Sequence, residues 1–83
     1  MAYTYILKTA HDDYYVGSTE NLLERLKAHQ AGKVFSTKYK LPVELVFKEY
    51  HITRADAQKK EYKIKNWKSR KMIEKIIELG PIV

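Results

Sequence analysis

The chain contains no cysteine and no long hydrophobic run. The lack of cysteine excludes disulfide bonds and thiolate metal sites, and it predicts a reducing compartment, with the cytoplasm as the default. No apolar run approaches the roughly 20 residues that a membrane-spanning helix needs, so we expect no membrane partner. The first residues begin a strand and lack a charged and then apolar leader, which predicts that there is no signal peptide.

Size and composition predict one small domain over residues 1–83. Hydrophobic residues make up 45% of the chain and charged residues 31%, a balance typical of globular rather than disordered proteins. A chain of this length leaves no room for a second domain.

The net charge of +6 is concentrated in a short basic stripe. Residues 54–71 contain eight basic and two acidic residues. The net charge of residues 1–53 is +1, and that of residues 72–83 is −1. Such a stripe is typical of proteins that bind polyanions, most often nucleic acid. The alternative is a lysine-rich helix that is simply well solvated. The candidate nucleic-acid contacts, including two from the preceding loop, are Lys33, Lys38, Lys59, Lys60, Lys63, Lys65, Lys68, Arg70 and Lys71.

Periodicity predicts three strands and three or four helices. Alternation of apolar and polar residues is typical of strands, and it occurs at residues 3–8, 14–17 and 43–52. Helical spacing and residues that favour helix ends predict helices within 18–32, 53–69 and 70–80. The order ββαβαα indicates an α+β fold, with a small three-stranded antiparallel sheet flanked by helices.

The first two predicted strands should pair as an antiparallel hairpin, because the turn between them is short. If this hairpin is symmetric about Ala10, Tyr5 lies directly opposite Tyr15 and both side chains share one face. Gly17 is expected to end the second strand and let the backbone turn.

Helix starts and strand faces also follow from the pattern. Ser18 or Thr19 is expected to cap the first helix, and Thr53 the second. In the third strand, alternation predicts four side chains on one face: Val43, Leu45, Phe47 and Glu49.

Arg25 and His29 are candidate functional residues. They lie one helical turn apart beside the apolar row of Leu22 and Leu26, and therefore at the border between core and solvent. The alternative is structural: Arg25 would pair with a nearby carboxylate, and His29 would cap the end of the helix.

Glu61 is a candidate metal ligand. It shares a helical row with Ala57 and Ile64, the expected packing face, where an unpaired carboxylate costs free energy. A lone carboxylate among cations, in a phosphate-binding setting, suits a divalent metal such as Mg²⁺. The alternative is a salt bridge to Lys65 or Arg25.

Two short motifs resemble the signatures of a known family. "TYI" at residues 4–6 and "YVG" at residues 15–17 resemble the two signatures of the GIY-YIG nucleases, with Thr4 in place of the first glycine. The phrases "YILK", "PVELVFKEY" and "EYKIKNWKSRK" are similar to a branch of short, single-domain bacterial members. The resemblance extends to about Lys71.

The resemblance implies positions for a catalytic site. Arg25 matches the family's helix arginine, His29 a position often held by histidine or tyrosine, and Glu61 the metal-binding glutamate. The two signatures add Tyr5 and Tyr15. We expect these five residues to converge on one concave surface.

The implied activity is an endonuclease, structure-specific or non-specific, that hydrolyses phosphodiester bonds with one Mg²⁺ or Mn²⁺ ion on Glu61. A tyrosine hydroxyl would help to deprotonate the attacking water, Arg25 would offset transition-state charge, and His29 would hydrogen-bond to a tyrosine or to phosphate. The partner would be nucleic acid, with DNA favoured, in repair or recombination. The sequence indicates no protein partner.

The alternative is a weak or inactive nucleic-acid-binding module of the same fold. Many family members carry an asparagine after the metal glutamate, and residues 71–83 contain none. Ser18 stands where repair members often have lysine, and the 83 residues hold no separate targeting domain. A third interpretation, a scaffold for an acidic protein, rests on the basic stripe alone.

Overall fold

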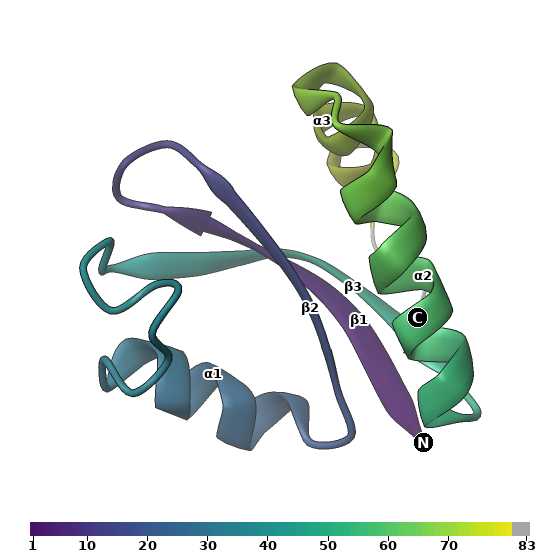
Figure 1. Ribbon diagram of the computed structural model, residues 1–83, viewed down its shortest axis with the longest axis horizontal. Helices are drawn as coiled ribbons and strands as arrows, with labels where there is room; N and C mark the ends of the chain where they lie inside the picture. The colour runs from purple at the N-terminus through teal and green to yellow at the C-terminus, as the bar shows by residue number, and fades with distance from the viewer. Residues whose placement is uncertain (81–83) are drawn as a thin grey trace.

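The computed structural model describes residues 1–80, which form one three-stranded sheet with helices on both faces (Figure 1). The strands are antiparallel in the order β2-β1-β3: β1 (Ala2–Thr9), β2 (Tyr14–Thr19) and β3 (Val43–His51). The helices are α1 (Leu22–Gln30), α2 (Arg54–Trp67) and α3 (Arg70–Glu78). The predicted fold class and element order are confirmed. The predicted domain extends to residue 83, and residues 81–83 lie outside the described part.

The two faces of the sheet pack against different helices. Tyr5 and Leu7 of β1 point to the face that α1 covers, where Val43 completes a buried cluster. Ile6, between them in sequence, points to the opposite face and packs with Ile64 of α2. This alternation follows from the two-residue period of a strand.

The hairpin register differs from the prediction by two residues. Tyr5 pairs with Gly17, and Tyr15 pairs with Leu7, so the hairpin is centred one residue later than Ala10. Tyr5 and Tyr15 share a face as diagonal neighbours, and their ring centroids are 6.2 Å apart. The turn is set by a hydrogen bond from the Thr9 N–H to the Asp13 carbonyl, a local closure that strand alternation does not reveal.

Gly17 does not end β2, which continues to Thr19, so that prediction was wrong. A Cβ atom at Gly17 would lie 2.6 Å from Tyr5 Oη and 2.7 Å from Tyr5 Cζ. No real Cβ tolerates such contacts. The glycine is therefore needed so that the Tyr5 ring can lie directly against the backbone of β2.

The predicted cap of α1 was also wrong. Ser18 and Thr19 belong to β2, and the N-cap is Asn21, whose side chain accepts a hydrogen bond from the Glu24 N–H. Because β2 is two residues longer than expected, the helix starts later. Thr53 caps α2 as predicted and accepts from the Asp56 N–H.

A bulge in β3 overturns the predicted single face of four residues. Ile6 pairs with Phe47 and Leu7 with Leu45, so the residue between, Val46, has no partner on β1. An extra residue reverses the alternation beyond it. Val43 and Leu45 therefore pack on the α1 side, and Phe47 packs in the cluster under α2.

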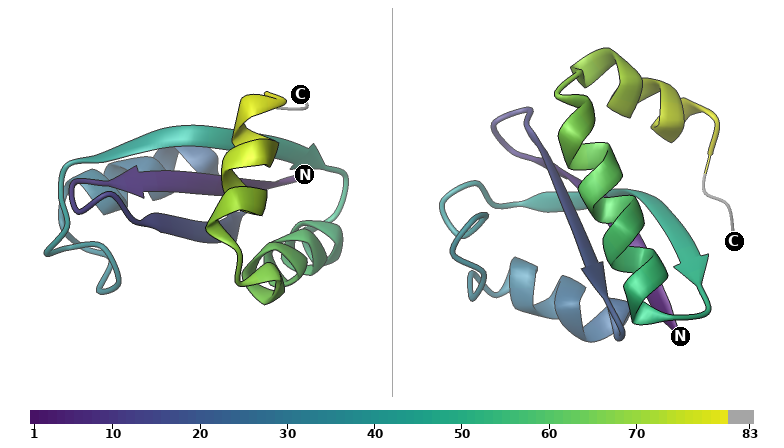
Figure 2. Two further views of the ribbon diagram at one scale, coloured as in Figure 1. Left: turned by 90° about the horizontal axis from the view of Figure 1, so that it is seen from above. Right: turned by 45° about the vertical axis from the view of Figure 1, so that its right-hand side comes forward.

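Helix α3 follows a sharp turn, in which Lys68 adopts a left-handed conformation and Ser69 caps the new helix. It runs at an angle to α2 (Figure 2) and packs Ile73, Ile76 and Ile77 against the α2-side core. Within residues 1–80 no helix is both long and apolar enough to cross a membrane.

Candidate active site

A chain of buried polar side chains lies between α1 and the sheet. Tyr5 Oη of β1 is 3.0 Å from Nε2 of His29 on α1, and Nδ1 of His29 is 2.8 Å from Oγ1 of Thr37. Tyr5 and His29 are fully buried, and Thr37 is 1% exposed. The Tyr15 ring packs edge-on against the His29 ring at 5.0 Å. Thr37 was not predicted, because nothing in its loop sequence marks it as a partner of His29.

Burial controls the protonation of the Tyr5 and His29 side chains. Burial raises the pKa of Tyr5 far above its ordinary value, and the neighbouring Tyr15 raises it further, whereas Arg25 opposes the shift. Burial and the Arg25 charge lower the pKa of His29. At neutral pH the phenol and the imidazole are therefore both uncharged. Both His29 nitrogens are occupied inside the protein, so its ring has no free atom for a substrate.

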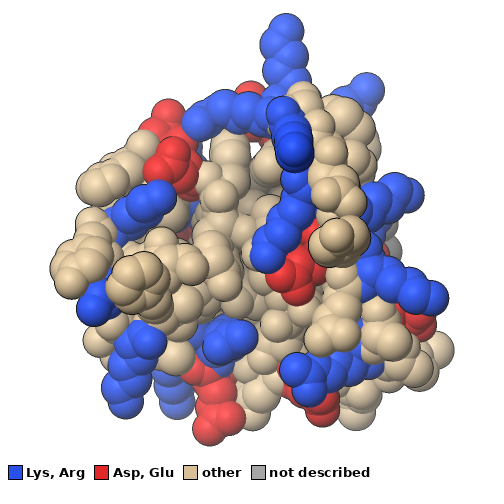
Figure 3. Space-filling view, viewed as in Figure 1, with Lys and Arg blue, Asp and Glu red and all other residues tan. Residues whose placement is uncertain are grey.

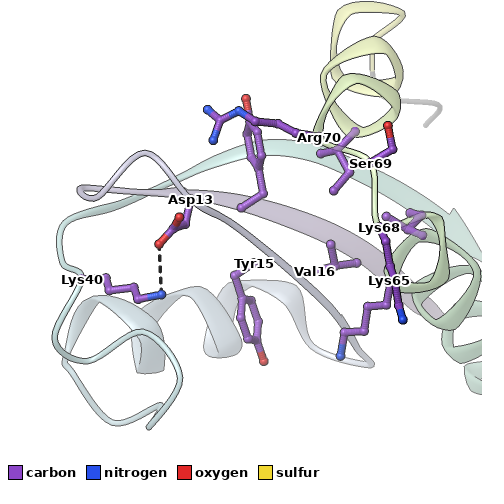
Figure 4. Close-up of a pocket in the computed structure, with 11 residues that line it drawn as sticks. Asp13, Tyr15, Val16, Lys40, Lys65, Lys68, Ser69 and Arg70 are labelled. Carbon is purple, nitrogen blue, oxygen red and sulfur yellow. Dashed lines mark hydrogen bonds and ion pairs between the residues drawn. The ribbon is translucent and has the colours of Figure 1, made fainter.

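Tyr15 and Arg25 are the accessible members of this group. Tyr15 is half-buried on β2, and its side chain extends away from the strand in the same direction as the Lys65 side chain (Figure 4). Arg25 is exposed, one helical turn before His29, and its charge acts on the pKa values of both Tyr5 and His29. In residues 1–80 no carboxylate forms an ion pair with Arg25.

Glu61 comes from the other side of the sheet. Its helix, α2, covers the face opposite Tyr5, but its carboxylate lies at the edge strand β2, where Ser18 Oγ donates to Oε1 at 2.5 Å. Lys65 Nζ donates to the second oxygen, Oε2, at 2.7 Å, so the salt bridge considered from the sequence is present. The Glu61 charge contributes to the raised pKa of Tyr5. The five predicted residues therefore surround β2 from two faces, rather than lying on one face.

Glu61 can serve as a single carboxylate ligand for a metal. Among residues 1–80, no three histidine, aspartate or glutamate side chains gather closely enough to hold an ion by themselves. Mg²⁺ is commonly bound by one or two carboxylates, with water and substrate phosphate supplying the remaining oxygens. Glu61, with the Ser18 hydroxyl beside it, fits that donor set. A metal on Oε2 requires Lys65 to move away.

A cationic groove runs beside Tyr15. It has a volume of about 550 Å³ and lies between the β1–β2 hairpin and the junction of α2 with α3. Blue side chains flank a mostly uncharged surface over β2 in the space-filling view (Figure 3). Four cations line the groove: Lys40, Lys65, Lys68 and Arg70. Lys40 was not predicted, and it bonds to Asp13 at 3.1 Å on the hairpin side of the groove (Figure 4).

The other predicted cations lie elsewhere. Lys59 and Lys63 are each two residues from Glu61, and therefore point roughly 160–200° away around α2. Lys60 approaches Glu49 of β3 at 3.7 Å. Exposed positions in the loop before β3 and in α3 hold two more, Lys33 and Lys71. Lys38 is half-buried against neighbouring aromatic rings.

A family model described as the GIY-YIG catalytic domain matches residues 1–75. The chain belongs to the GIY-YIG family. This confirms the resemblance seen in "TYI" and "YVG". The family is one of nucleases, which act on nucleic acid and generally use divalent metals.

Similar proteins occur in several bacteria. A UPF0213 protein of Bacillus pumilus is 39% identical over 70 residues, which cover 83% of this chain and 71% of the relative. One from Staphylococcus haemolyticus is 39% identical over 77 residues, 92% of this chain and 93% of the relative. The solution NMR structure of the UPF0213 protein BH0048 from Bacillus halodurans has a TM-score of 0.63 at 30% identity, and the match covers 96% of this chain and 86% of that one. These names state no activity.

Proposed function

We propose that the chain is a metal-dependent endonuclease that hydrolyses phosphodiester bonds of DNA. One observation carries the proposal. Accessible Tyr15 lines a groove that holds cations, and Glu61 adjoins this groove through its bond to Lys65, which also lines it. A phosphodiester backbone laid along this groove would meet a phenol and a carboxylate, and the exposed Arg25, whose charge acts on Tyr5, lies on the α1 side of the same strand.

The cations of the groove would hold the backbone without reading its sequence, because lysine and arginine contacts to phosphate carry no base information. Arg25 would approach the reacting phosphate directly. Since its guanidinium is paired with no carboxylate in the described residues, it is available to stabilise the negative charge that grows in the transition state.

Tyr15 is the better candidate for direct contact with the attacking water. Tyr5 is fully buried, and its raised pKa keeps the phenol protonated at neutral pH, so it is poorly suited to take a proton from water. We assign Tyr5 and His29 a positioning role: the hydrogen bond between them, and the packing of both rings on Tyr15, orient the Tyr15 phenol. The His29 ring stays neutral, so it adds no charge that would repel Arg25.

A divalent ion bound at Glu61 would supply Lewis-acid polarisation of the scissile phosphate. Ser18 would orient the Glu61 carboxylate through its hydrogen bond to Oε1. Lys65, released from Oε2, would be free to contact the DNA backbone in the groove that it lines.

The second candidate function is a DNA-binding module without useful turnover. The bonding of Glu61 favours it, because both carboxylate oxygens already have protein donors, Ser18 and Lys65. In this alternative the carboxylate ties α2 to the edge strand, and the groove binds the backbone without cleaving it.

A nicking assay separates the two functions. The wild type is incubated with Mg²⁺ or Mn²⁺ and with duplex, branched and single-stranded DNA, and with RNA. We expect cleavage of at least one DNA substrate, its abolition by Glu61→Gln with binding retained, and no effect of Glu44→Gln at an exposed position on β3. If the wild type binds DNA measurably but cleaves nothing with either metal, the chain is a DNA-binding module without useful turnover.

The Arg25→Ala variant tests the transition-state role. We expect activity to fall on the order of 10²-fold or more, with the melting temperature unchanged because the side chain is exposed. A large drop in melting temperature, shared with Glu61→Gln, would instead indicate that both residues are structural.

A further inference from the structure

The loop between α1 and β3, residues 31–42, exposes two aromatic rings. Phe35 is 81% exposed and Tyr39 is 77% exposed. Between them, the Lys38 ammonium lies 5.4 Å from the Phe35 ring centroid and 4.9 Å from that of Tyr39. Single exposed hydrophobic residues are normal on protein surfaces. Two rings that share one cation form a surface suited to a flat partner that carries negative charge.

The loop is held in place, so the rings are not exposed through loose packing. Thr37, between the rings in sequence, is buried and hydrogen-bonds to His29. The Lys40 N–H donates to the Thr37 carbonyl, and the Lys40 carbonyl accepts from the Ala10 N–H of the hairpin. The backbone is thus tied to α1 on one side and to the hairpin on the other. The geometry directs Phe35 and Tyr39 outward while Thr37 points inward.

The charge of the loop indicates the chemistry of its partner. Residues 31–42 contain three lysines, Lys33, Lys38 and Lys40, and no acidic residue. Lys40 also lines the groove beside Tyr15, so the aromatic surface adjoins the cationic one. A ligand that spans both must offer planar rings and a polyanionic backbone together.

We propose that Phe35, Lys38 and Tyr39 form a stacking site for unpaired nucleotides. Bases would stack on the two rings, and Lys38 would contact the intervening phosphate. Bases in an intact duplex are stacked on one another and cannot present their faces. The inference rests on the proposed function and deepens it: the preferred substrates carry a single-stranded segment next to the bond that is cut.

Binding measured without metal tests the inference independently of cleavage. A fluorescein-labelled single-stranded oligodeoxynucleotide and a duplex of the same length are titrated in EDTA with the wild type and with the Phe35→Ala/Tyr39→Ala double variant. We expect roughly ten-fold or greater weakening for the single strand and little change for the duplex. The matched control is Tyr62→Ala, which removes a 70% exposed tyrosine beside Lys59 on α2.

An abasic oligonucleotide distinguishes stacking from charge. It has the same backbone but no bases, so the wild type should bind it about as weakly as the double variant binds the normal strand. Phe35→Leu/Tyr39→Leu, which keeps apolar bulk but removes the π faces, should behave like the alanine variant. Melting temperatures of all variants should match the wild type, since both rings are exposed.

Equal single-strand affinity of the wild type and the double variant would overturn the inference. So would a change in oligomeric mass of the double variant without a change in oligonucleotide affinity, which would make the loop a contact between copies. Stacking without any cleavage would contradict the proposed nuclease activity and support the stacking site. Cleavage with unchanged single-strand affinity of the double variant would support the nuclease activity and contradict the stacking site.

Discussion

The two faces of the sheet are built on different chemistry. Under α2 the cluster of Ile6, Val16, Phe47 and Ile64 is apolar and packs with side chains of α3, and the buried Thr4 hydroxyl donates to the Ala57 carbonyl of α2. Under α1 the buried residues include a tyrosine, a histidine and a threonine joined by hydrogen bonds. An apolar core needs only shape and volume, whereas buried polar groups need partners with correct geometry. We therefore expect the α2 side to contribute most to stability, and the α1 side holds the side chains to which we assign a positioning role.

The edge strand β2 connects the two faces. Val16 points into the apolar core, while Tyr15 and Gly17 on either side of it face the polar chain. Ser18 then turns back toward α2 and holds Glu61. A single strand therefore contacts the buried groups of both faces.

The largest effect is expected in the apolar core. Ile64→Ala removes a fully buried side chain that fits α2 to the sheet, and it should lower the free energy of unfolding by about 2–5 kcal/mol. Thermal denaturation measures this. Leu23→Ala, at a 66% exposed position on α1, is the control and should change little. Equal effects of the two substitutions would contradict the assignment of stability to the α2 side.

The next effect concerns the contact between Gly17 and Tyr5. Gly17→Ala should cost about 1–3 kcal/mol through overpacking and should displace the Tyr5 ring, because the new methyl group would overlap it. We also expect lower nuclease activity in assays run well below the melting temperature, where the loss of stability by itself does not reduce activity. An unchanged melt would mean that the ring has room to move.

Thr37→Val tests how much the hydrogen bond between His29 and Thr37 contributes to the stability of the buried polar group Tyr5, His29 and Thr37. The substitution keeps the shape but leaves His29 Nδ1 buried without its partner, at a cost of about 1–2 kcal/mol. Denaturation by urea measures it. Thr37→Ser, which retains the hydroxyl, is the matched control and should recover most of the stability.

The polar face should also make stability depend on pH. Burial lowers the pKa of His29, so between its folded and its ordinary pKa the unfolded chain binds more protons. The contribution is fully present above about pH 6.5 and is lost as the pH falls toward the folded pKa. For a single group the slope is at most about 1.4 kcal/mol per pH unit. His29→Gln should flatten the profile, and an unaltered profile would assign the dependence to other groups.

The smallest effect on stability, below about 0.5 kcal/mol, is expected from surface lysines, yet they should differ in DNA binding. Lys65→Gln/Lys68→Gln removes two cations of the groove, whereas Lys59→Gln/Lys63→Gln removes two from the far side of α2. The first pair should reduce the slope of log affinity against log salt by about 2, and the second by much less. Equal reductions would mean that DNA does not follow the groove.

Several features follow from local sequence alone. The order of strands and helices and the Thr53 cap agree with the structure. The packing row of α1, Leu22, Leu26 and His29, also faces the core as its spacing predicts. These features depend on periods of two or 3.6 residues and on caps within one turn. The family resemblance could likewise be recognised from short motifs in order.

The geometry of the candidate site was predicted less completely, because its contacts join distant segments. Tyr5, Tyr15, Arg25 and His29 could be named, but the Thr37 bond to His29 and the Lys40 position in the groove could not. The stripe at residues 54–71 indicated positive charge correctly, although only three of its cations line the groove.

The sequence by itself determined which elements form and which residue types could carry chemistry. The tertiary structure alone decided that Tyr5 meets Gly17, that the β3 bulge sends Phe47 to the α2 side, and that Glu61 reaches the edge strand through Ser18. Local periodicity depends on neighbours along the chain. Register, bulges and side-chain partners depend on how segments dozens of residues apart fit together, and a shift of one residue between strands changes every such contact.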